Sequence, residues 1–295
     1  VSVACSDLVG PATIRAEMDI EVLRQWYTDV TENSTSQGST TAAWHLGTGW
    51  YADALIPLDS GECSGQTFHI PDRENAVPGQ RWQGMWVDIY VARDVPAGTY
   101  TGTVTVTGEG LLVSLEVELK VHDVTLPDDF TCEVGLNNYG SIGKKGSDLR
   151  LRYYQMAHRH RMAIHEHYIQ TETTGAGADM RGVWDAYDAE MGKYLSGNAF
   201  TAQYGYRGPG EGKPLRWIYL PVEILSGHAW PLPAEQVKES AYDEAVVAMT
   251  RDFSEHFAAK GWTSTDMMFF VNGLDEPTSV EQVEDIRYFG DLCRE

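Results

Sequence analysis

Hydrophobic and polar side chains alternate between residues 86 and 121, which predicts antiparallel β-strands that each bury one face. Three alternating runs are separated by turns rich in glycine or proline, and they cover residues 86–91, 99–107 and 111–121. In the third run the side chains that share the apolar face are Leu111, Val113, Leu115, Val117, Leu119 and Val121. We expect the three runs to form a meander in an antiparallel β-sandwich. Residues 14–31 and 44–58 alternate more weakly and should add strands.

Beyond residue 129 the pattern changes to strands that alternate with helices. The predicted strands are 131–136, 162–168, 217–223 and 267–274. Helices are predicted at 147–161 and 235–260, with a last one capped by Thr278 or Ser279. Strand and helix in this order predict a parallel sheet with right-handed crossovers.

The apolar spacing within these helices predicts which face each one buries. In the helix at 235–260 an apolar residue recurs every four positions, and Gly261 follows as a stop signal. The recurring residues are Val237, Ala241, Ala245, Met249, Phe253 and Phe257. For the other two helices we expect the inward stripes to be Leu149, Tyr153, Met156 and His160, and Val283, Ile286, Phe289 and Leu292.

The change of pattern predicts two domains: a β-sandwich at 1–128 and an α/β domain at 129–295. A (β/α)8 barrel takes about 250 residues. Only 167 residues remain from position 129 to 295, and four strand–helix units are legible in them. We therefore expect the first half of a barrel-type domain.

The net charge of −21 excludes some classes of partner. An acidic surface repels phosphate backbones, so nucleic acid and anionic membranes are disfavoured. No run approaches 18 consecutive apolar residues, so we expect no transmembrane helix. A neutral ligand such as a carbohydrate is compatible with this charge, no cofactor is indicated, and self-association is left open.

Four cysteines, Cys5, Cys63, Cys132 and Cys293, stand far apart without the close spacing of a structural zinc site. Four cysteines allow three complete pairings, and Cys5 with Cys63 is the pair we favour because both lie in the N-terminal half. Asn33-Ser34-Thr35 matches a glycosylation sequon. These features favour an extracellular or cell-surface location.

The strongest candidate for chemistry is Asp275-Glu276-Pro277, directly after the predicted strand 267–274. Holding two neighbouring carboxylates together is costly, since like charges raise the pKa of one of them, and such pairs mark functional sites. The plainer interpretation is that acidic residues precede a helix and complement its N-terminal dipole. Active sites of (β/α)8 barrels lie at the carboxyl ends of the strands. Polar and aromatic residues predicted at or near these ends, as contacts for a substrate, are Tyr139, His165, His167, Glu223 and Asn272.

Two other groups of residues have alternative interpretations. Trp184 and Tyr219 could stack on a sugar ring, and core packing is an equally good interpretation of each. Trp50, Trp82 and Trp86 could do the same in the sandwich, but we expect them to pack in its core or at a domain interface. His165 and His167 share a strand face, but two ligands do not make a zinc site, so no metal is predicted.

Three sequence blocks resemble proteins of the glycoside hydrolase family 123 type. They are QRWQGMWVDIYVARDVPAGTYTGTVTV at 80–106, GWYADALIPLD at 49–59 and LDEP at 274–277. The resemblance implies a β-sandwich joined to a (β/α)8 barrel with an Asp-Glu pair after barrel strand 4, and an exo-acting N-acetyl-β-galactosaminidase. It also implies that this chain is an internal segment of a longer protein.

The same resemblance implies a role for each carboxyl group. Glu276 would be the general acid/base, and Asp275 would orient the 2-acetamido group of the substrate as it attacks the anomeric carbon. This substrate-assisted retaining mechanism needs no carboxylate nucleophile.

Two alternatives stay open. The chain could be a non-catalytic extracellular protein that keeps the fold for carbohydrate binding or assembly, because a fold does not guarantee activity. It could also be a glycosidase for sugars without the acetamido group, which would need a separate nucleophile, and Glu223 is the candidate.

Overall fold

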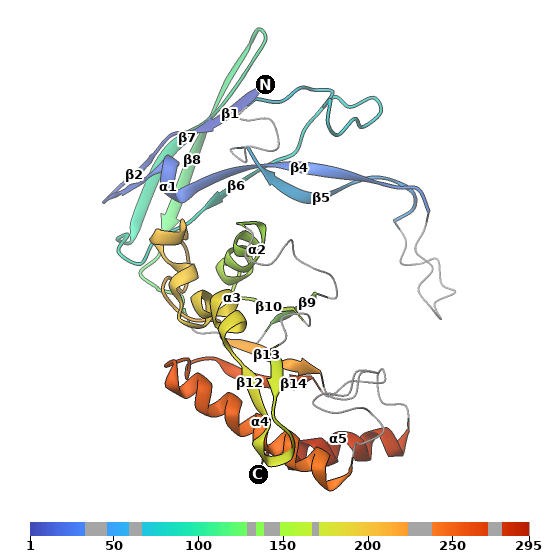
Figure 1. Ribbon diagram of the computed structural model, residues 1–295. Coiled ribbons are helices and arrows are strands. Elements are labelled where there is room, and N and C mark those ends of the chain that lie inside the picture. Colours follow the sequence, from blue (N-terminus) through green and yellow to red (C-terminus); the bar gives the residue numbers. More distant parts are fainter. Residues whose placement is uncertain are drawn as a thin grey trace. The chain divides into compact units, whose positions relative to one another are not determined.

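The computed structural model describes eight stretches of the 295-residue chain (Figure 1). They are residues 1–32, 46–58, 67–128, 134–138, 148–166, 171–223, 238–270 and 279–294. The chain divides into two compact units, Val1–Leu126 and Pro127–Glu295. Each unit has its own hydrophobic core.

The first unit contains two antiparallel sheets. One sheet is formed by β1 (Ser2–Cys5), β2 (Leu8–Val9), β3 (Thr13–Ile14), β7 (Gly98–Gly108) and β8 (Leu111–Val121). The other places β4 (Ile20–Val30) between β5 (Gly49–Pro57) and β6 (Met85–Ile89), and the short helix α1 (Ala16–Asp19) precedes β4. Buried Leu8, Ile14 and Tyr100 of the first sheet pack against Ile20 and Ile89 of the second. Two sheets with a shared apolar core form a sandwich.

The hairpin of β7 and β8 follows directly from the alternating sequence. The two strands pair in continuous antiparallel register from Gly98↔Val121 to Gly108↔Leu111. Gly110 in the turn has φ +68°, a backbone conformation that favours glycine. Gly102 is needed for a different reason: a Cβ there would lie 2.5 Å from Leu8 Cδ2 and 2.6 Å from the Asp7 carbonyl oxygen. The β1–β2 segment can approach β7 only because this position has no side chain.

The predicted meander is wrong for its first strand. β6 pairs with β4, with Val22 opposite Val87, and belongs to the sheet that does not contain β7 and β8. Alternation shows that a strand exists and which of its faces is apolar. It carries no information about which strand is its neighbour, because both sheets of a sandwich offer the same kind of apolar surface.

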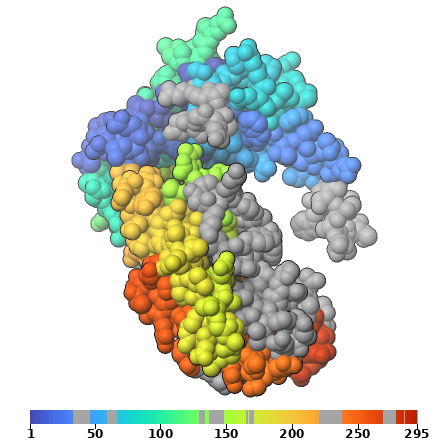
Figure 2. Space-filling view, viewed as in Figure 1, coloured from blue at the N-terminus to red at the C-terminus, as the bar shows by residue number. Residues whose placement is uncertain are grey.

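Two packing expectations for the sandwich are also wrong. Only the second half of the β8 stripe is partly covered, at Val117, Leu119 and Val121, whereas Leu111, Val113 and Leu115 are exposed. Trp82 and Trp86 are 68% and 53% exposed, so they do not pack in the core, and the alternative of a domain interface stays a prediction. The tip of the β7–β8 hairpin extends past the strands of the opposing sheet, as the green segment at the top of Figure 1 and Figure 2 shows, and the exposed half of the β8 stripe lies in this tip.

The predicted disulfide between Cys5 and Cys63 is not formed, because Cys5 carries a free thiol. Burial raises the pKa of this thiol. Cys293 is a free thiol as well. Asn33, Cys63 and Cys132 lie outside the described residues.

The second unit combines strands with covering helices. Its strands are β9 (Gly135–Asn138), β10 (Ala163–Glu166), β11 (Glu172–Thr174), β12 (Arg181–Val183), β13 (Trp217–Glu223) and β14 (Asp266–Phe270). Its α-helices are α2 (Asp148–Arg159), α3 (Asp185–Leu195), α4 (Ser240–Ala259) and α5 (Val280–Leu292), and short 3-10 helices cover Gly177–Asp179, Asn198–Phe200 and Ala202–Tyr204. β9 pairs with β10 and β13 with β14, both in parallel, as predicted. The described residues contain no closed barrel.

The sequence did not predict the β11–β12 hairpin or α3. Both fall in a glycine-rich stretch with weak periodicity, where the hairpin contains three residues per strand. Contacts with α4 stabilise the hairpin: Asp252 accepts hydrogen bonds from the Gly182 amide and from the Trp184 indole, at 2.9 and 3.0 Å. Strands this short depend on tertiary contacts of this kind.

The long helix α4 and its stop signal are confirmed. Ala245, Met249, Phe253 and Phe257 are buried, and Gly261, with φ +74°, follows the last turn. Of the other two predicted members of the stripe, Ala241 is exposed and Val237 lies outside the described residues. Helix α5 begins after Ser279 in a capping box, in which Ser279 Oγ accepts from the Gln282 amide and Gln282 Oε1 accepts from the Ser279 amide. Phe289 of α5 is fully buried, but Val283 and Ile286 are exposed, so the inward stripe predicted for this helix is only partly right.

The predicted inward stripe of α2 is wrong. Its apolar members Leu149, Tyr153 and Met156 are 51%, 43% and 42% exposed. The buried face instead carries Arg150, Tyr154, Ala157 and His158. This face can be buried because other elements supply partners for its polar groups, as described below.

Within the described residues, no helix is both long and apolar enough to cross a membrane.

Candidate active site

In each of the two parallel strand pairs, the carboxyl ends of the two strands lie side by side. In the β9–β10 pair His165 lies opposite Asn137 and Glu166 opposite Asn138, and both strands end there. In the β13–β14 pair Glu223 lies opposite Phe270, again at the ends of both strands. β10 also contacts β13. The backbones of His165 and Glu223 therefore occupy the edge of the sheet at which parallel α/β folds bind their ligands.

Other predicted site residues fall in segments that the structure does not describe. Tyr139, His167, Asn272, Asp275 and Glu276 all lie outside the described residues, and for His165 and Glu223 only the backbone is described. In the sequence, Tyr139 comes directly after β9, and position 272 is two residues beyond the end of β14. The Asp275-Glu276 pair stays a prediction.

A buried ionic cluster lies next to the carboxyl end of β10. Arg150 of α2 contacts Glu166 of β10, with Nε–Oε2 3.0 Å, and Glu190 of α3, with Nη1–Oε1 2.6 Å. The Tyr154 hydroxyl donates to Glu166 Oε2 at 3.1 Å. All three charged side chains are at most 7% exposed. The cluster fastens one strand and two helices to each other directly beneath the candidate site.

The electrostatics of this cluster are those of one cation shared by two carboxylates. Burial lowers the pKa of Arg150, but the hydrogen bond to Glu190 and the charges of both glutamates outweigh burial and raise this pKa. Burial, followed by the charge of Glu166, raises the pKa of Tyr154 well above its ordinary value. Arg150 therefore stays charged and Tyr154 stays a hydrogen-bond donor.

Sequence reasoning missed this cluster. Arg150, Tyr154, Ala157 and His158 recur at i, i+4, i+7 and i+8, which is the spacing of one helix face. The signal was present, but the exposed stripe of Leu149, Tyr153 and Met156 has the same spacing and a more apolar composition. Glu190 gave no signal, because it lies in a helix that the sequence did not predict.

Trp184 is held in a packed environment between α3 and α4. Its ring stacks on His256 with centroids 4.2 Å apart, and its edge contacts Tyr187 and Phe253. Its indole nitrogen donates to Asp252. His256 Nε2 in turn contacts Asp188 Oδ1 at 2.8 Å. These contacts agree with the interpretation in which Trp184 packs in the core.

Tyr219 lies at half-buried depth on β13, on the strand face that also carries Trp217. The two rings meet edge to face with centroids 5.7 Å apart. Ile218 points to the other face and packs in the core cluster that contains Tyr154, Tyr194 and Phe257 of the helices. Tyr219 and Trp217 therefore lie on the sheet face opposite the one covered by these helices.

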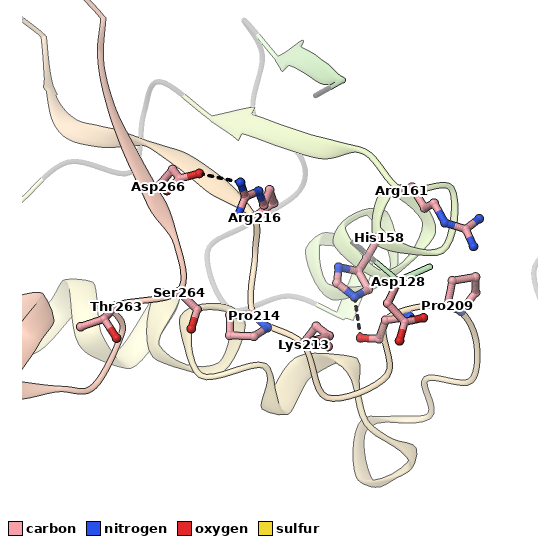
Figure 3. Close-up of a pocket in the computed structure, with 11 residues that line it drawn as sticks. Asp128, His158, Arg161, Pro209, Lys213, Pro214, Arg216, Thr263, Ser264 and Asp266 are labelled. Carbon is pink, nitrogen blue, oxygen red and sulfur yellow. Dashed lines mark hydrogen bonds and ion pairs between the residues drawn. The ribbon is translucent and has the colours of Figure 1, made fainter. Parts of the chain in front are cut away.

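A separate cavity of about 370 Å³ lies at the opposite edge of the sheet (Figure 3). Arg216 directly precedes β13 and Asp266 begins β14, so this cavity is at the amino-terminal ends of the strands. None of the predicted site residues lines it. Within the described residues, no group of three His, Cys, Asp or Glu side chains is placed to hold a metal ion.

Comparison with known proteins adds one result to this geometry. A solved structure of a family 123 glycoside hydrolase from Clostridium perfringens, studied for the hydrolysis of glycolipid glycans, superimposes with a TM-score of 0.50. The two chains share a fold. The match covers 98% of this chain at 12% sequence identity, and the chain spans about half (51%) of the length of that structure. At this identity the likeness concerns the fold alone.

No protein-family model matches the sequence, and no curated protein matches it either.

Proposed function

We propose that this chain is part of a glycoside hydrolase that removes terminal N-acetyl-β-hexosamine residues, with N-acetylgalactosamine as the favoured sugar. The observation that carries the proposal is the shared fold with a family 123 glycoside hydrolase over 98% of the chain. The parallel pairs β9–β10 and β13–β14 support it, because the Asp275-Glu276 pair follows the carboxyl end of β14 in the sequence.

In the proposed reaction Glu276 donates a proton to the glycosidic oxygen as the bond to the leaving group breaks. The acetamido oxygen of the substrate forms the new bond to the anomeric carbon, and Asp275 orients and stabilises this group. Water then attacks the anomeric carbon, the bond from this carbon to the acetamido oxygen breaks, and Glu276 takes up a proton from the water, so the configuration is retained overall. Neither carboxylate acts as a nucleophile.

The ionic cluster of Arg150, Glu166 and Glu190 supports a rigid site. A catalytic constellation needs its supporting backbone held in place, and sites built on strands are held better than sites on loops. The cluster fixes the end of β10, where the backbone of His165 lies, to α2 and α3. Tyr219 is half-buried on the sheet face that also carries Trp217, and its ring is the proposed stacking surface for the sugar.

Hydrolysis of an aryl N-acetyl-β-D-galactosaminide tests the proposal. The parent protein, in the full-length form in which it is encoded, is compared with Glu276→Gln and Asp275→Asn. Each substitution should lower kcat/KM by about 10²-fold or more, the effect expected from losing acid–base assistance. Glu284→Gln makes the same chemical change at an exposed position of α5 and should leave the rate unchanged.

Three outcomes would contradict the proposal. Turnover that is insensitive to both substitutions would remove the carboxylate pair from the mechanism. No turnover on this substrate, its gluco-isomer or an analogue without the acetamido group would favour the carbohydrate-binding or assembly role instead. Turnover only on the analogue would indicate a carboxylate nucleophile, to be tested at Glu223.

A further inference from the structure

The cavity at the amino-terminal edge of β13 and β14 has the features of a second ligand site. Its walls come from Asp128, the end of α2, the loop before β13 and the segment that leads into β14. Its volume of about 370 Å³ is within the range of pockets that hold small molecules. Figure 3 places Arg161 and Pro209 at one end of the cavity and Thr263 and Ser264 at the other.

Arg161 is held in a backbone conformation that glycine would adopt more easily. Its φ is +57°, directly after the last turn of α2. The Arg161 amide donates to the carbonyl of His158 at 2.9 Å, and the Met162 amide donates to that of Ala157 at 2.8 Å. This is a Schellman turn, whose left-handed position is usually glycine. Strained residues of this kind cluster at ligand sites.

The guanidinium of Arg161 is available to a ligand. In the part of the chain that the structure describes, this group makes no ion pair and no side-chain hydrogen bond, although the protein has 43 acidic side chains. A guanidinium offers a planar fork of donors that matches the oxygens of a carboxylate or a phosphate. An unpaired arginine in a cavity of a chain with net charge −21 therefore indicates an anionic ligand.

The remaining charged groups of the cavity are already engaged. Arg216 pairs with Asp266, Nη2–Oδ2 3.2 Å, and Asp128 Oδ1 accepts from the Gly210 amide at 3.1 Å. Lys213 takes part in further interactions. His158 Nε2 hydrogen-bonds the Gly210 carbonyl oxygen at 2.9 Å. The lining residues thus carry three cations, Arg161, Lys213 and Arg216, against two carboxylates, Asp128 and Asp266.

The far end of the cavity is polar but uncharged. Among the described residues, the hydroxyl groups of Thr263 and Ser264 have no hydrogen-bond partner. A hydroxyl group both donates and accepts hydrogen bonds, which suits the hydroxyl groups of a sugar. One end therefore suits an anion and the other a polyhydroxylated body.

We propose that this cavity binds a small sugar that carries an oxyanion, a carboxylate or a phosphate, with the anion at Arg161 and the hydroxyl groups toward Thr263 and Ser264. The site is at the opposite edge of the sheet from the proposed glycosidase site. It does not depend on the proposed function, and a protein without glycosidase activity could still have it.

Calorimetric titration of the protein with D-glucose 6-phosphate, D-glucuronate, inorganic phosphate and D-glucose tests the proposal. The two sugar anions distinguish a phosphate from a carboxylate ligand, and inorganic phosphate and glucose each lack one half of the proposed ligand. At least one sugar anion should bind at least about tenfold more tightly than glucose or inorganic phosphate, since charge-assisted hydrogen bonds are the strong ones.

Two variants at left-handed positions assign the binding to Arg161. Arg161→Gly removes the guanidinium and places glycine where the turn favours it, so the melting temperature should be unchanged or higher while affinity falls at least about tenfold. Lys238→Gly is the matched control: Lys238 also has positive φ, +69°, and also carries a cation, but it does not line the cavity. Its affinity should equal that of the parent.

The double substitution Thr263→Ala and Ser264→Ala should weaken the binding of the sugar anion but leave the binding of inorganic phosphate unchanged. The proposal is overturned if Arg161→Gly binds as the parent does, if glucose binds as tightly as the sugar anions, or if none of the four probes binds. Inorganic phosphate binding as tightly as glucose 6-phosphate would overturn the sugar part and leave a simple anion site.

Discussion

Each unit of the protein contains one buried arginine between two carboxylates, and the two sites differ in how they meet the solvent. In the first unit Arg24 of β4 pairs with Asp72, which is buried, and with Glu74, at 3.2 Å, which is 44% exposed. In the second unit Arg150 pairs with Glu166 and Glu190, and both are buried. One network is open to water at one end and the other is closed.

The partners of the two arginines also differ in kind. Asp72 and Glu74 come from a loop, and Asp72 Oδ1 accepts two backbone amide hydrogens, from Glu74 at 2.8 Å and Asn75 at 2.9 Å. Arg24 also lies over the Trp26 ring, 5.3 Å from its centroid. The Arg24 network therefore holds an irregular loop against a sheet, and its buried carboxylate, Asp72, has several independent contacts.

The second network joins three regular elements through a single cation. Arg150 contacts both glutamates, and Glu166 also accepts a hydrogen bond from the Tyr154 hydroxyl. A buried charge that loses its partner is costly, whereas an exposed one is hydrated. We therefore expect that replacing a charge lowers the free energy of unfolding little where water reaches the network and strongly where it does not.

The largest effect should come from Arg150→Met. This change removes the cation that buried Glu166 and Glu190 share and should lower the free energy of unfolding by about 3–5 kcal/mol. Urea unfolding measures the change, and hydrogen exchange should localise it to α2, β10 and α3. Arg152→Met, at an exposed position of the same helix, is the control and should have little effect. A loss below about 1 kcal/mol for Arg150→Met would mean that the cluster is not closed to water.

A smaller effect is expected for Arg24→Met. Asp72 keeps its two backbone amide donors and Glu74 turns to water, so the free energy of unfolding should fall by about 2–3 kcal/mol. Arg81→Met, exposed in the same unit, is the control. If Arg24→Met costs as much as Arg150→Met, the difference in solvent access does not decide the energetics of the two networks.

His158 extends the comparison to pH. Burial lowers the pKa of its imidazole, and the Gly210 carbonyl and Asp128 oppose this only in part. The unfolded chain therefore binds a proton at higher pH than the folded chain. Stability contributed by neutral His158 is complete above about pH 6.5 and is lost as the pH falls from there toward the folded pKa.

Replacing His158 by glutamine keeps a donor for the Gly210 carbonyl and removes the titration. Between pH 7.5 and pH 5 the free energy of unfolding should fall less in His158→Gln than in the parent, as measured by urea unfolding at each pH. His160→Gln, at an exposed position two residues further on, should follow the parent. Equal slopes for parent and His158→Gln would show that folding does not lower the pKa of His158.

The smallest effect should come from Glu74→Gln. This change weakens a contact that is open to solvent, and such pairs contribute about 0–1 kcal/mol. Glu190→Gln makes the same change in the closed network and should cost clearly more. Urea unfolding of both variants under the same conditions compares the half-exposed carboxylate with the buried one. Equal decreases in the free energy of unfolding would show that solvent access does not distinguish the two networks.

Much of the secondary structure could be predicted because it follows from local periodicity. β7, β8, β13 and α4 appear where the apolar spacing placed them. The position of α2 was also predicted, but its orientation was not, because the buried face is held by ion pairs with residues 16 and 40 positions away. No local pattern carries such distant partners.

The candidate site divides in the same way. The sequence located polar residues at the ends of predicted strands, and the parallel pairing of β9 with β10 and of β13 with β14 then brought the strand ends together in pairs. The ionic cluster beneath them was not predicted, since charged residues are normally assigned to the surface. The cavity around Arg161 gave no signal, because its walls come from four segments that lie far apart in the sequence, at 128, 158–161, 209–216 and 263–266.

By itself the sequence determined the strands of the sandwich, the alternation of strand and helix after residue 129, and the carboxylate pair that follows β14, because these depend on spacing within one segment. Only the tertiary structure decided that β6 joins β4, that α2 buries Arg150 and exposes Leu149, and that Arg161 lines a cavity. These depend on which distant groups satisfy a buried charge or cover an apolar face, and a chain acquires such partners only when it folds.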